Sequence, residues 1–230
     1  MSKQLFGGKK FLYNENNPVT LTFILNNDAM TTPYEEISKE DIQHLDLYYY
    51  EGETIVIEKN EDIPEAINEL YNETIIGIDT ERKPSFKKGN INPVSLIQLA
   101  TRNKVYLFRI NFFKIPDKLI SIFENPEILK IGVGLDDDLQ GLKELKPFTP
   151  KGFVDLSKYF QKKEYKQSSL KYLAATVLNV RISKGQQVSN WERTQLTSAQ
   201  IKYAATDAWV PRKIYLSMIE DGNFPQTMTD

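Results

Sequence analysis

Two acidic residues end a segment that otherwise reads as protein interior. The stretch TIIGIDT, residues 74–80, has the length and apolar character of a strand buried on both faces. Because side chains alternate along a strand, Asp79 and Glu81 point to the same side, where Gly77 leaves room. Adjacent carboxylates repel unless a cation lies between them, so the pattern predicts a cation site. A plain strand-to-loop transition is the alternative.

A run of three aspartates follows a second buried strand, residues 128–135, and begins a predicted helix. At helical spacing the apolar stripe of this helix consists of Leu135, Leu139, Leu142 and Leu145. Asp136 and Asp137 fall on the polar side, whereas Asp138 falls within the stripe. A carboxylate there is costly unless it is paired, hydrogen-bonded or bound to a metal. If the helix began later, or with a 3₁₀ turn, Asp137 would take this place.

The last predicted helix carries another inward-facing aspartate. Its start is marked by a capping box formed by Thr197 and Gln200. Asp207 lies in the middle of an apolar stripe, and Tyr203 lies one turn before it on the same face. A structural explanation exists for each acidic residue alone, such as a hydrogen bond to a backbone amide or an arginine. Agreement among three separate segments favours a shared ligand site.

The composition limits the chemistry of such a site. The chain has no cysteine and only one histidine, His44, which excludes thiolate zinc sites and cysteine nucleophiles and makes a serine triad or a histidine-rich metal site unfavourable. Oxygen ligands prefer hard cations such as Mg²⁺ or Mn²⁺. Four carboxylates are the ligand set of two-metal sites for phosphoryl transfer, in which two cations bind the attacking water and the leaving oxygen.

The remaining pattern predicts the elements that hold these residues. Residues 47–57 read as two strands joined by a glycine turn, and residues 92–110 read as a hairpin that continues the first acidic strand as an antiparallel meander. Strand–helix units and then helices follow, which implies an α/β fold with a mixed sheet flanked by helices. We divide the chain into an N-terminal extension (1–50), a main domain (51–222) and a tail (223–230).

Basic residues are concentrated late in the chain. Residues 151–184 hold eight Lys or Arg and two Asp or Glu, whereas residues 31–70 hold 12 acidic residues and two Lys. Clustered positive charge in an acidic protein favours a local polyanion-binding face, with a solvated surface as the alternative. The residues predicted to contact phosphates are Arg82, Lys87, Lys88, Lys184 and Arg193. Trp191 is expected in the core, and Asp155 is expected to cap a helix.

The acidic segments resemble a known family. GIDTE, GVGLDDD followed by leucine, and YAATD are similar to the three exonuclease motifs of the DEDD superfamily of 3′–5′ exonucleases, in the branch of ribonuclease D and the Werner-syndrome exonuclease. The resemblance spans residues 55–218 and includes VSLIQLAT after the first motif. Where the Werner-type domain has an aromatic residue after the first motif, this chain has Arg82.

The resemblance implies a ribonuclease H-like fold and a ligand set for two divalent cations, Mg²⁺ or Mn²⁺. Asp79 and Glu81 match the ligand pair of the first motif, Asp138 the second and Asp207 the third. Tyr203 matches the water-orienting tyrosine of the DEDDy subclass. The implied activity is hydrolysis of terminal phosphodiester bonds at a DNA or RNA 3′ end, releasing nucleoside monophosphates. A non-catalytic nucleic-acid-binding module and an endonuclease are the alternatives.

The N-terminal residues show no hydrophobic signal region, and the apolar stretch 21–25 is too short to span a membrane. We therefore expect a cytoplasmic protein that does not bind membranes. The oligomeric state is left open.

Overall fold

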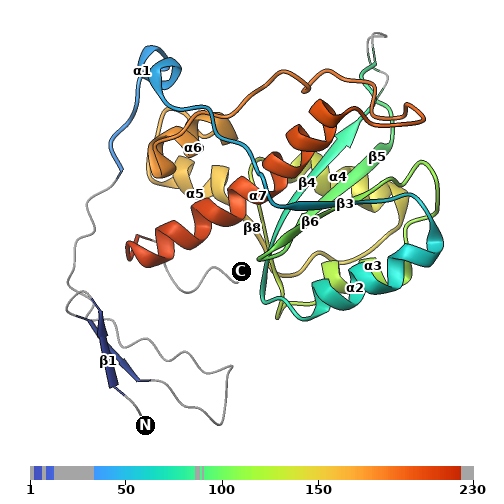
Figure 1. Cartoon of the computed structure of the whole chain (residues 1–230), viewed down its shortest axis with the longest axis horizontal. Coiled ribbons are helices and arrows are strands. Elements are labelled where there is room, and N and C mark those ends of the chain that lie inside the picture. The colour runs from blue at the N-terminus through green and yellow to red at the C-terminus, as the bar shows by residue number, and fades with distance from the viewer. Residues whose placement is uncertain (1–2, 7–8, 13–33, 86–88, 90, 224–230) are drawn as a thin grey trace. The chain divides into compact units, whose positions relative to one another are not determined.

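The structure is a computed structural model that describes residues 3–6, 9–12, 34–85, 89 and 91–223. The chain divides into two compact units, 1–32 and 33–230. The first unit contains an antiparallel pair, β1 (Lys3–Phe6) and β2 (Lys9–Leu12). The second unit contains all other elements (Figure 1). Residues 34–50, predicted as part of an extension, belong to this unit, and their Ile42 and Tyr50 are buried in its core.

The second unit is built on one mixed sheet, as predicted. Its strands are β3 (Glu53–Ile57), β4 (Ile75–Arg82), β5 (Val94–Ala100), β6 (Lys104–Phe108), β7 (Leu129–Gly132) and β8 (Phe153–Asp155), in the order β3-β6-β5-β4-β7-β8. The predicted antiparallel meander is confirmed for β4, β5 and β6, whereas β3 pairs in parallel with β6, and β7 pairs in parallel with both β4 and β8. The first acidic strand, β4, therefore lies inside the sheet.

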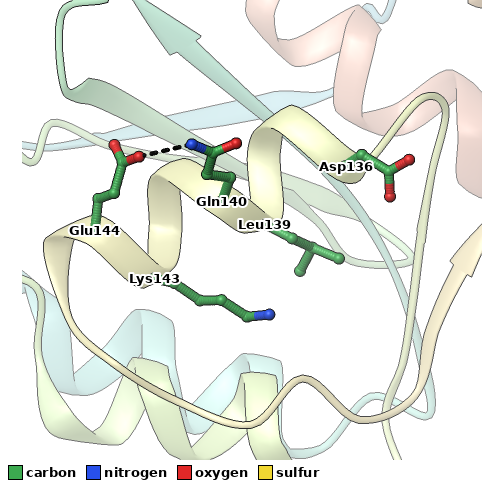
Figure 2. A pocket seen from close by; sticks show the side chains of 5 residues that line it. All are labelled: Asp136, Leu139, Gln140, Lys143 and Glu144. Atoms are coloured by element: carbon green, nitrogen blue, oxygen red, sulfur yellow. Dashed lines mark hydrogen bonds between the residues drawn. The ribbon is translucent and has the colours of Figure 1, made fainter.

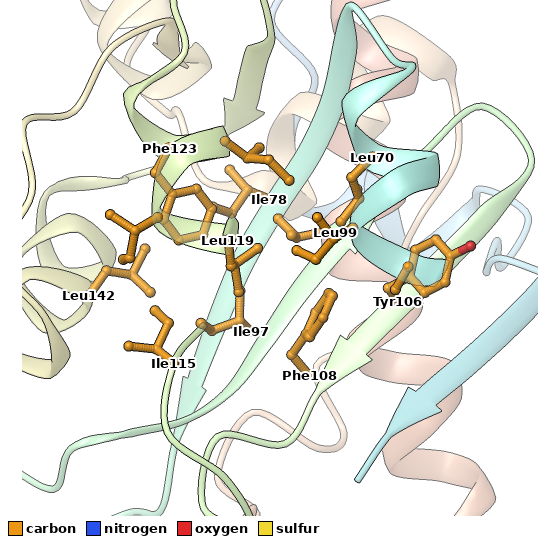
Figure 3. Packing of buried hydrophobic residues seen from close by; sticks show 14 of the residues in the cluster. Leu70, Ile78, Ile97, Leu99, Tyr106, Phe108, Ile115, Leu119, Phe123 and Leu142 are labelled. Atoms are coloured by element: carbon orange, nitrogen blue, oxygen red, sulfur yellow. The ribbon is translucent and has the colours of Figure 1, made fainter. Parts of the chain in front are cut away.

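Helices cover both faces of the sheet. One face packs against α2 (Ile63–Tyr71), α3 (Asp117–Glu124) and α4 (Asp136–Leu145). Figure 3 shows this core, in which Ile78, Ile97 and Leu99 of the sheet meet Leu119 and Phe123 of α3. The other face packs against α7 (Ser198–Glu220), which is joined by α5 (Leu156–Lys162) and α6 (Leu170–Leu178). The described helices also include the short α1 (Lys39–His44) and a 3₁₀ turn before α2.

One predicted strand is wrong. Residues 47–50 form no strand with a neighbour, apart from a single bridge between Leu47 and Arg181. The Tyr50 amide instead donates to the Thr206 hydroxyl of α7 at 3.0 Å, and the Tyr48 ring stacks on Trp209. The Tyr48 amide donates to the Arg181 carbonyl at 2.8 Å, so the segment is bound to α7 and to the chain at Arg181 and does not form a strand of the sheet.

A glycine sets how closely α7 approaches the sheet. A Cβ atom at Gly77 would lie 1.9 Å from the Ala208 carbonyl oxygen of α7. Small residues, Ala204, Ala205 and Ala208, form the facing side of the helix and are fully buried. The predicted capping box at Thr197 is present at the start of α7. This contact fixes α7 against β4 and brings the preceding residue, Asp207, to the sheet.

In the ranges that the structure describes, no helix has both the length and the apolar character needed to span a membrane.

Candidate active site

Three carboxylates meet where the end of β4 faces α7. Asp79 and Glu81 lie on one face of β4, and Asp207 lies on α7. Each offers one carboxylate oxygen, and these three oxygens lie within 4.8 Å of one another. Asp207 is buried, and the other two are half-buried. The structure thus brings together three of the four acidic residues that the sequence pattern singled out.

The fourth carboxylate lies beside this group and is held separately. The helix α4 begins at Asp136, so helical phase leaves Asp136 and Asp137 exposed and Asp138 half-buried. The Thr80 hydroxyl donates a hydrogen bond to Asp138 Oδ1. Asp138 lines the same pocket as the group of three but is not part of it. Asp138 is the half-buried and hydrogen-bonded member of the three aspartates, as predicted, whereas Asp137 is exposed, although it also lines the pocket.

Thr80 was missed by the sequence reasoning. It lies between Asp79 and Glu81 but on the opposite face of β4, because side chains alternate along a strand. A threonine in a strand is common, so its only signal in the sequence is this position. Its hydrogen bond to Asp138 links the first and second acidic segments.

The loop before α4 is fixed by Asp155 at the end of β8. One of its carboxylate oxygens accepts from the Gly134 amide at 2.8 Å and from the Ser157 amide at 2.9 Å, and the other accepts from the Leu135 amide at 3.0 Å. Gly134 has a φ of 73°, a conformation that favours glycine. The predicted capping role of Asp155 is confirmed for α5, and the residue also anchors the start of α4.

Arg82 ties the end of β4 to α4. Its guanidinium donates to the Asn92 carbonyl at 3.1 Å and to the Asp137 carbonyl at 2.9 Å. Gly141 leaves space for it, because a Cβ there would lie 2.0 Å from Nη2 of Arg82. Two nitrogens of this side chain are therefore already bonded to backbone, and its predicted phosphate contact stays a prediction.

Of the other basic residues predicted to contact phosphates, the structure places one at the pocket. Lys184 lines the pocket, and its positive charge acts to lower the pKa of Asp207. Arg193 is exposed, and its backbone carbonyl accepts from Arg109. Lys87 and Lys88 lie outside the described residues. Trp191 is fully buried, as predicted.

The carboxylates line a pocket of about 540 Å³ between β4, α4, α6 and α7. The residues that line it also include Ser157, Ser168, Ser169, Lys171 and Lys184. A second hollow, of about 410 Å³, is lined only by residues of α4 (Figure 2). There the Gln140 amide donates to the Glu144 carboxylate at 3.0 Å. Because every lining residue belongs to one helix, no polar groups from different elements converge on this hollow. The acidic pocket is the one with the features of a ligand site.

Burial and mutual repulsion disfavour negative charge in this group. Burial, and then the neighbouring carboxylates, raise the pKa of Asp79 well above its ordinary value and raise the pKa of Glu81 to about 9. Burial raises the pKa of Asp207 to about 7, although Tyr203 and Lys184 act in the opposite direction. Burial also raises the pKa of Asp138, against the hydrogen bond from Thr80. Burial, followed by the Asp207 charge, raises the pKa of Tyr203, which keeps its hydroxyl protonated.

This donor set fits hard divalent cations. Carboxylate oxygens gathered within 4.8 Å are ligands of the type that Mg²⁺ and Mn²⁺ prefer. A cation between them would offset the repulsion that raises their pKa values. Among the described residues, Lys184 is the only cationic side chain that acts on the charge of Asp207, and the three grouped oxygens have no ion pair with a basic residue.

Stability without metal is expected to fall as the pH rises from 5 to 7. The pKa of Glu81 changes from an ordinary 4.5 to about 9 in the fold, and that of Asp207 from 3.8 to about 7. At a pH between the unfolded and the folded pKa of each group, the folded chain holds a proton that the unfolded chain has released, so rising pH favours unfolding. Thermal unfolding in EDTA, followed by circular dichroism at each pH, measures this.

Two controls separate this effect from other titrations. Above pH 7 Lys130 acts in the opposite direction, because burial lowers its pKa to about 7, so the comparison stays below that pH. Glu81→Gln should flatten the slope, because the amide does not titrate. A wild-type stability that rises steadily from pH 5 to pH 7, with the same slope in Glu81→Gln, would contradict the expectation.

The chain is similar to nucleases in sequence. A family model described as 3′–5′ exonuclease matches residues 54–222. The bifunctional 3′–5′ exonuclease/ATP-dependent helicase WRN of Mus musculus is 35% identical over 161 residues, which are 66% of this chain and 11% of that protein. The chain spans less than half the length of the first curated relatives it matches.

Solved structures agree on the fold. The Nibbler EXO domain of Aedes aegypti superposes with a TM-score of 0.69 at 22% identity, covering 76% of this chain and 92% of that domain. The ribonuclease D of Trypanosoma brucei, solved in complex with RNA, gives a TM-score of 0.65 at 21% identity, covering 78% and 66%. The ribonuclease H-like fold implied by the motifs is confirmed. Because the family model covers most of the sequence, this chain belongs to the 3′–5′ exonuclease family.

Proposed function

We propose that this chain is a metal-dependent 3′–5′ exonuclease that hydrolyses terminal phosphodiester bonds of nucleic acid and releases nucleoside monophosphates. The observation that carries the proposal is the group of Asp79, Glu81 and Asp207, whose oxygens lie within 4.8 Å in a pocket shared with Asp138 and Tyr203. Membership of the exonuclease family supports it.

Each residue of the site has a proposed role. Asp79, Glu81, Asp138 and Asp207 hold two divalent cations, Mg²⁺ or Mn²⁺. When bound, such cations stabilise the negative charge that develops on the phosphate and lower the pKa of the attacking water. Tyr203 lies one turn before Asp207, and its protonated hydroxyl orients the water by a hydrogen bond. Lys184 contacts a substrate phosphate at the pocket wall.

The proposed substrate is the 3′ end of a nucleic acid. The Trypanosoma brucei ribonuclease D was solved with RNA, and the mouse relative combines its exonuclease with a helicase. Discrimination between RNA and DNA depends on contacts to the 2′-hydroxyl. Both nucleic acids therefore belong in the first test.

Digestion of end-labelled oligonucleotides tests the proposal. DNA and RNA labelled at either end are incubated with the protein and Mg²⁺, Mn²⁺ or EDTA. The expected result is a ladder from 5′-labelled substrate, immediate mononucleotide release from 3′-labelled substrate, and no product in EDTA. Cleavage of circular DNA would point to an endonuclease, and binding without any product would point to a non-catalytic module.

Tyr203→Phe is expected to lower kcat by about 10²-fold, at the lower end of the effect of groups that act on the reacting proton. The phenyl ring keeps the packing against Trp191, whose ring centroid lies 6.1 Å from that of Tyr203. The unfolding temperature and KM should therefore change little. Steady-state kinetics on a 5′-labelled oligonucleotide measure the effect, and an unchanged kcat would remove Tyr203 from the reaction.

A further inference from the structure

Gln98 is a polar residue in a strand that is otherwise apolar around it. It lies in the middle of β5 and is fully buried. Neither Oε1 nor Nε2 of its amide has a hydrogen-bond partner among the residues that the structure describes. Buried polar side chains are usually paired, and each unpaired group costs about 1–3 kcal/mol. A methionine or leucine would fill the same space without this cost. The choice of glutamine therefore indicates that the amide has a role in binding.

The strand register places this amide beside the acidic group. Gln98 pairs directly with Asp79 across the antiparallel β4–β5 ladder, so both side chains leave the same face of the sheet. Directly opposed residues have Cβ atoms about 4.5–5.5 Å apart, a distance that a glutamine side chain spans. The neighbouring pair, Gly77 with Ala100, is the place where α7 touches the sheet. Gln98 therefore lies under α7, opposite Asp79 on the neighbouring strand.

The other positions directly beside Gln98 on this face are apolar. Leu107 lies opposite it on β6, and Leu96 and Ala100 flank it along β5. All three belong to the buried cluster that packs against α7. Of these four adjacent positions, only Asp79 has a side chain that can accept a hydrogen bond.

We propose that Gln98 is a positioning residue: its amide is unpartnered in the metal-free fold, and when a cation is bound its Nε2 donates to one oxygen of Asp79 and keeps the other oxygen directed at the cation between Glu81 and Asp207. The inference rests on the proposed function, because its consequence is tighter cation binding. An amide suits this position, since it donates to a carboxylate without adding positive charge that would repel the cation. A buried lysine would compete with the metal, and an aliphatic residue would leave the carboxylate free to rotate. Partners of this kind orient metal ligands in other sites.

The test is Mn²⁺ binding by the full chain, measured by isothermal titration calorimetry, with unfolding temperatures in EDTA. Gln98→Met keeps the volume and removes the amide. Its Mn²⁺ affinity is expected to fall 10- to 100-fold, whereas its unfolding temperature in EDTA stays equal or rises because two unpaired polar atoms are lost. Leu99→Met is the matched control, since Leu99 lies on the same strand, points to the other face, and accepts methionine at little cost.

The outcomes are distinct. A Gln98→Met variant that binds Mn²⁺ as tightly as the wild type overturns the inference and leaves the exonuclease proposal intact. A lower unfolding temperature in EDTA with unchanged Mn²⁺ affinity also overturns it, because the amide is then structural. If Gln98→Met does not fold, Gln98→Leu replaces it in the same comparison. A wild-type chain that binds no Mn²⁺ and degrades no oligonucleotide overturns both the inference and the proposed function.

Discussion

Asp79→Asn is expected to abolish exonuclease activity and, at the same time, to stabilise the metal-free protein at neutral pH. The change removes one charge from a group whose oxygens lie within 4.8 Å of one another. Loss of one preorganised donor that stabilises developing charge lowers kcat by about 10²–10³-fold, and loss of a direct cation ligand should cost at least the upper value. The opposite effect on stability follows because burial and repulsion raise the pKa of Asp79, so its ionised form destabilises the fold.

This pair of opposite effects separates a functional residue from a structural one. Residues that support the fold lose stability and activity together when they are replaced. Replacing a metal ligand that is held close to other carboxylates against their repulsion lowers the activity and raises the stability of the protein. Initial rates with a 5′-labelled oligonucleotide in Mn²⁺, and thermal unfolding in EDTA at pH 7, measure the two sides.

Asp136→Asn is the matched control for this experiment. Asp136 is exposed at the start of α4, forms an ion pair with Lys158, and does not line the acidic pocket. Exposed ion pairs contribute about 0–1 kcal/mol, so rate and stability should both stay near the wild-type values. An Asp79→Asn variant with more than a tenth of the wild-type rate would contradict the proposed role.

The acidic residues were predictable from the sequence because local periodicity decides them. The alternation of a strand places Asp79 with Glu81, and the phase of a helix selects Asp138 over its two neighbours. The same holds for the capping box at Thr197, whose partners are three residues apart. In each case the residues that decide the side-chain direction lie within a few positions of one another along the chain.

Contacts between distant segments were not predictable in this way. Arg82 is basic and follows the first acidic pair, so the sequence predicts that it contacts phosphate. In the structure it binds the backbone carbonyls of Asn92 and Asp137, which come from a loop and a helix that only the fold places nearby. Residues 47–50 have the aromatic, β-forming character of a strand and yet pack on α7. The position of Gln98 beside Asp79 depends on the register of β4 and β5, which the sequence between them does not state.

Gly77→Ala is expected to separate α7 from β4 and so to lower both stability and activity. The added Cβ would lie 1.9 Å from the Ala208 carbonyl oxygen, a backbone atom that cannot move without the helix. Overpacking of this kind costs about 1–3 kcal/mol and occasionally more, and a clash with backbone belongs at the upper end. For a domain of this size, about 3 kcal/mol lowers the unfolding temperature by about 6–12 °C.

The loss of activity should exceed what the loss of stability explains. Asp207 follows Thr206 and precedes Ala208 on α7, so a shift of the helix at Ala208 moves the Asp207 carboxylate away from Asp79 and Glu81. Rates measured well below the unfolding temperature of the variant isolate this effect, because the chain is then folded. The Mn²⁺ concentration for half-maximal activity should rise as the three oxygens move apart.

Gly185→Ala provides the control for adding a methyl group to a glycine. The nearest atom to its new Cβ would be the Ser183 hydroxyl oxygen at 3.3 Å, on a short side chain that can turn aside. Its unfolding free energy should stay within about 0.5 kcal/mol of the wild type. If Gly77→Ala kept both the wild-type unfolding temperature and the wild-type Mn²⁺ requirement, the close contact of α7 with β4 would not be what places Asp207. A fall in stability with an unchanged Mn²⁺ requirement would show instead that the helix yields elsewhere and that the three carboxylates hold their own spacing.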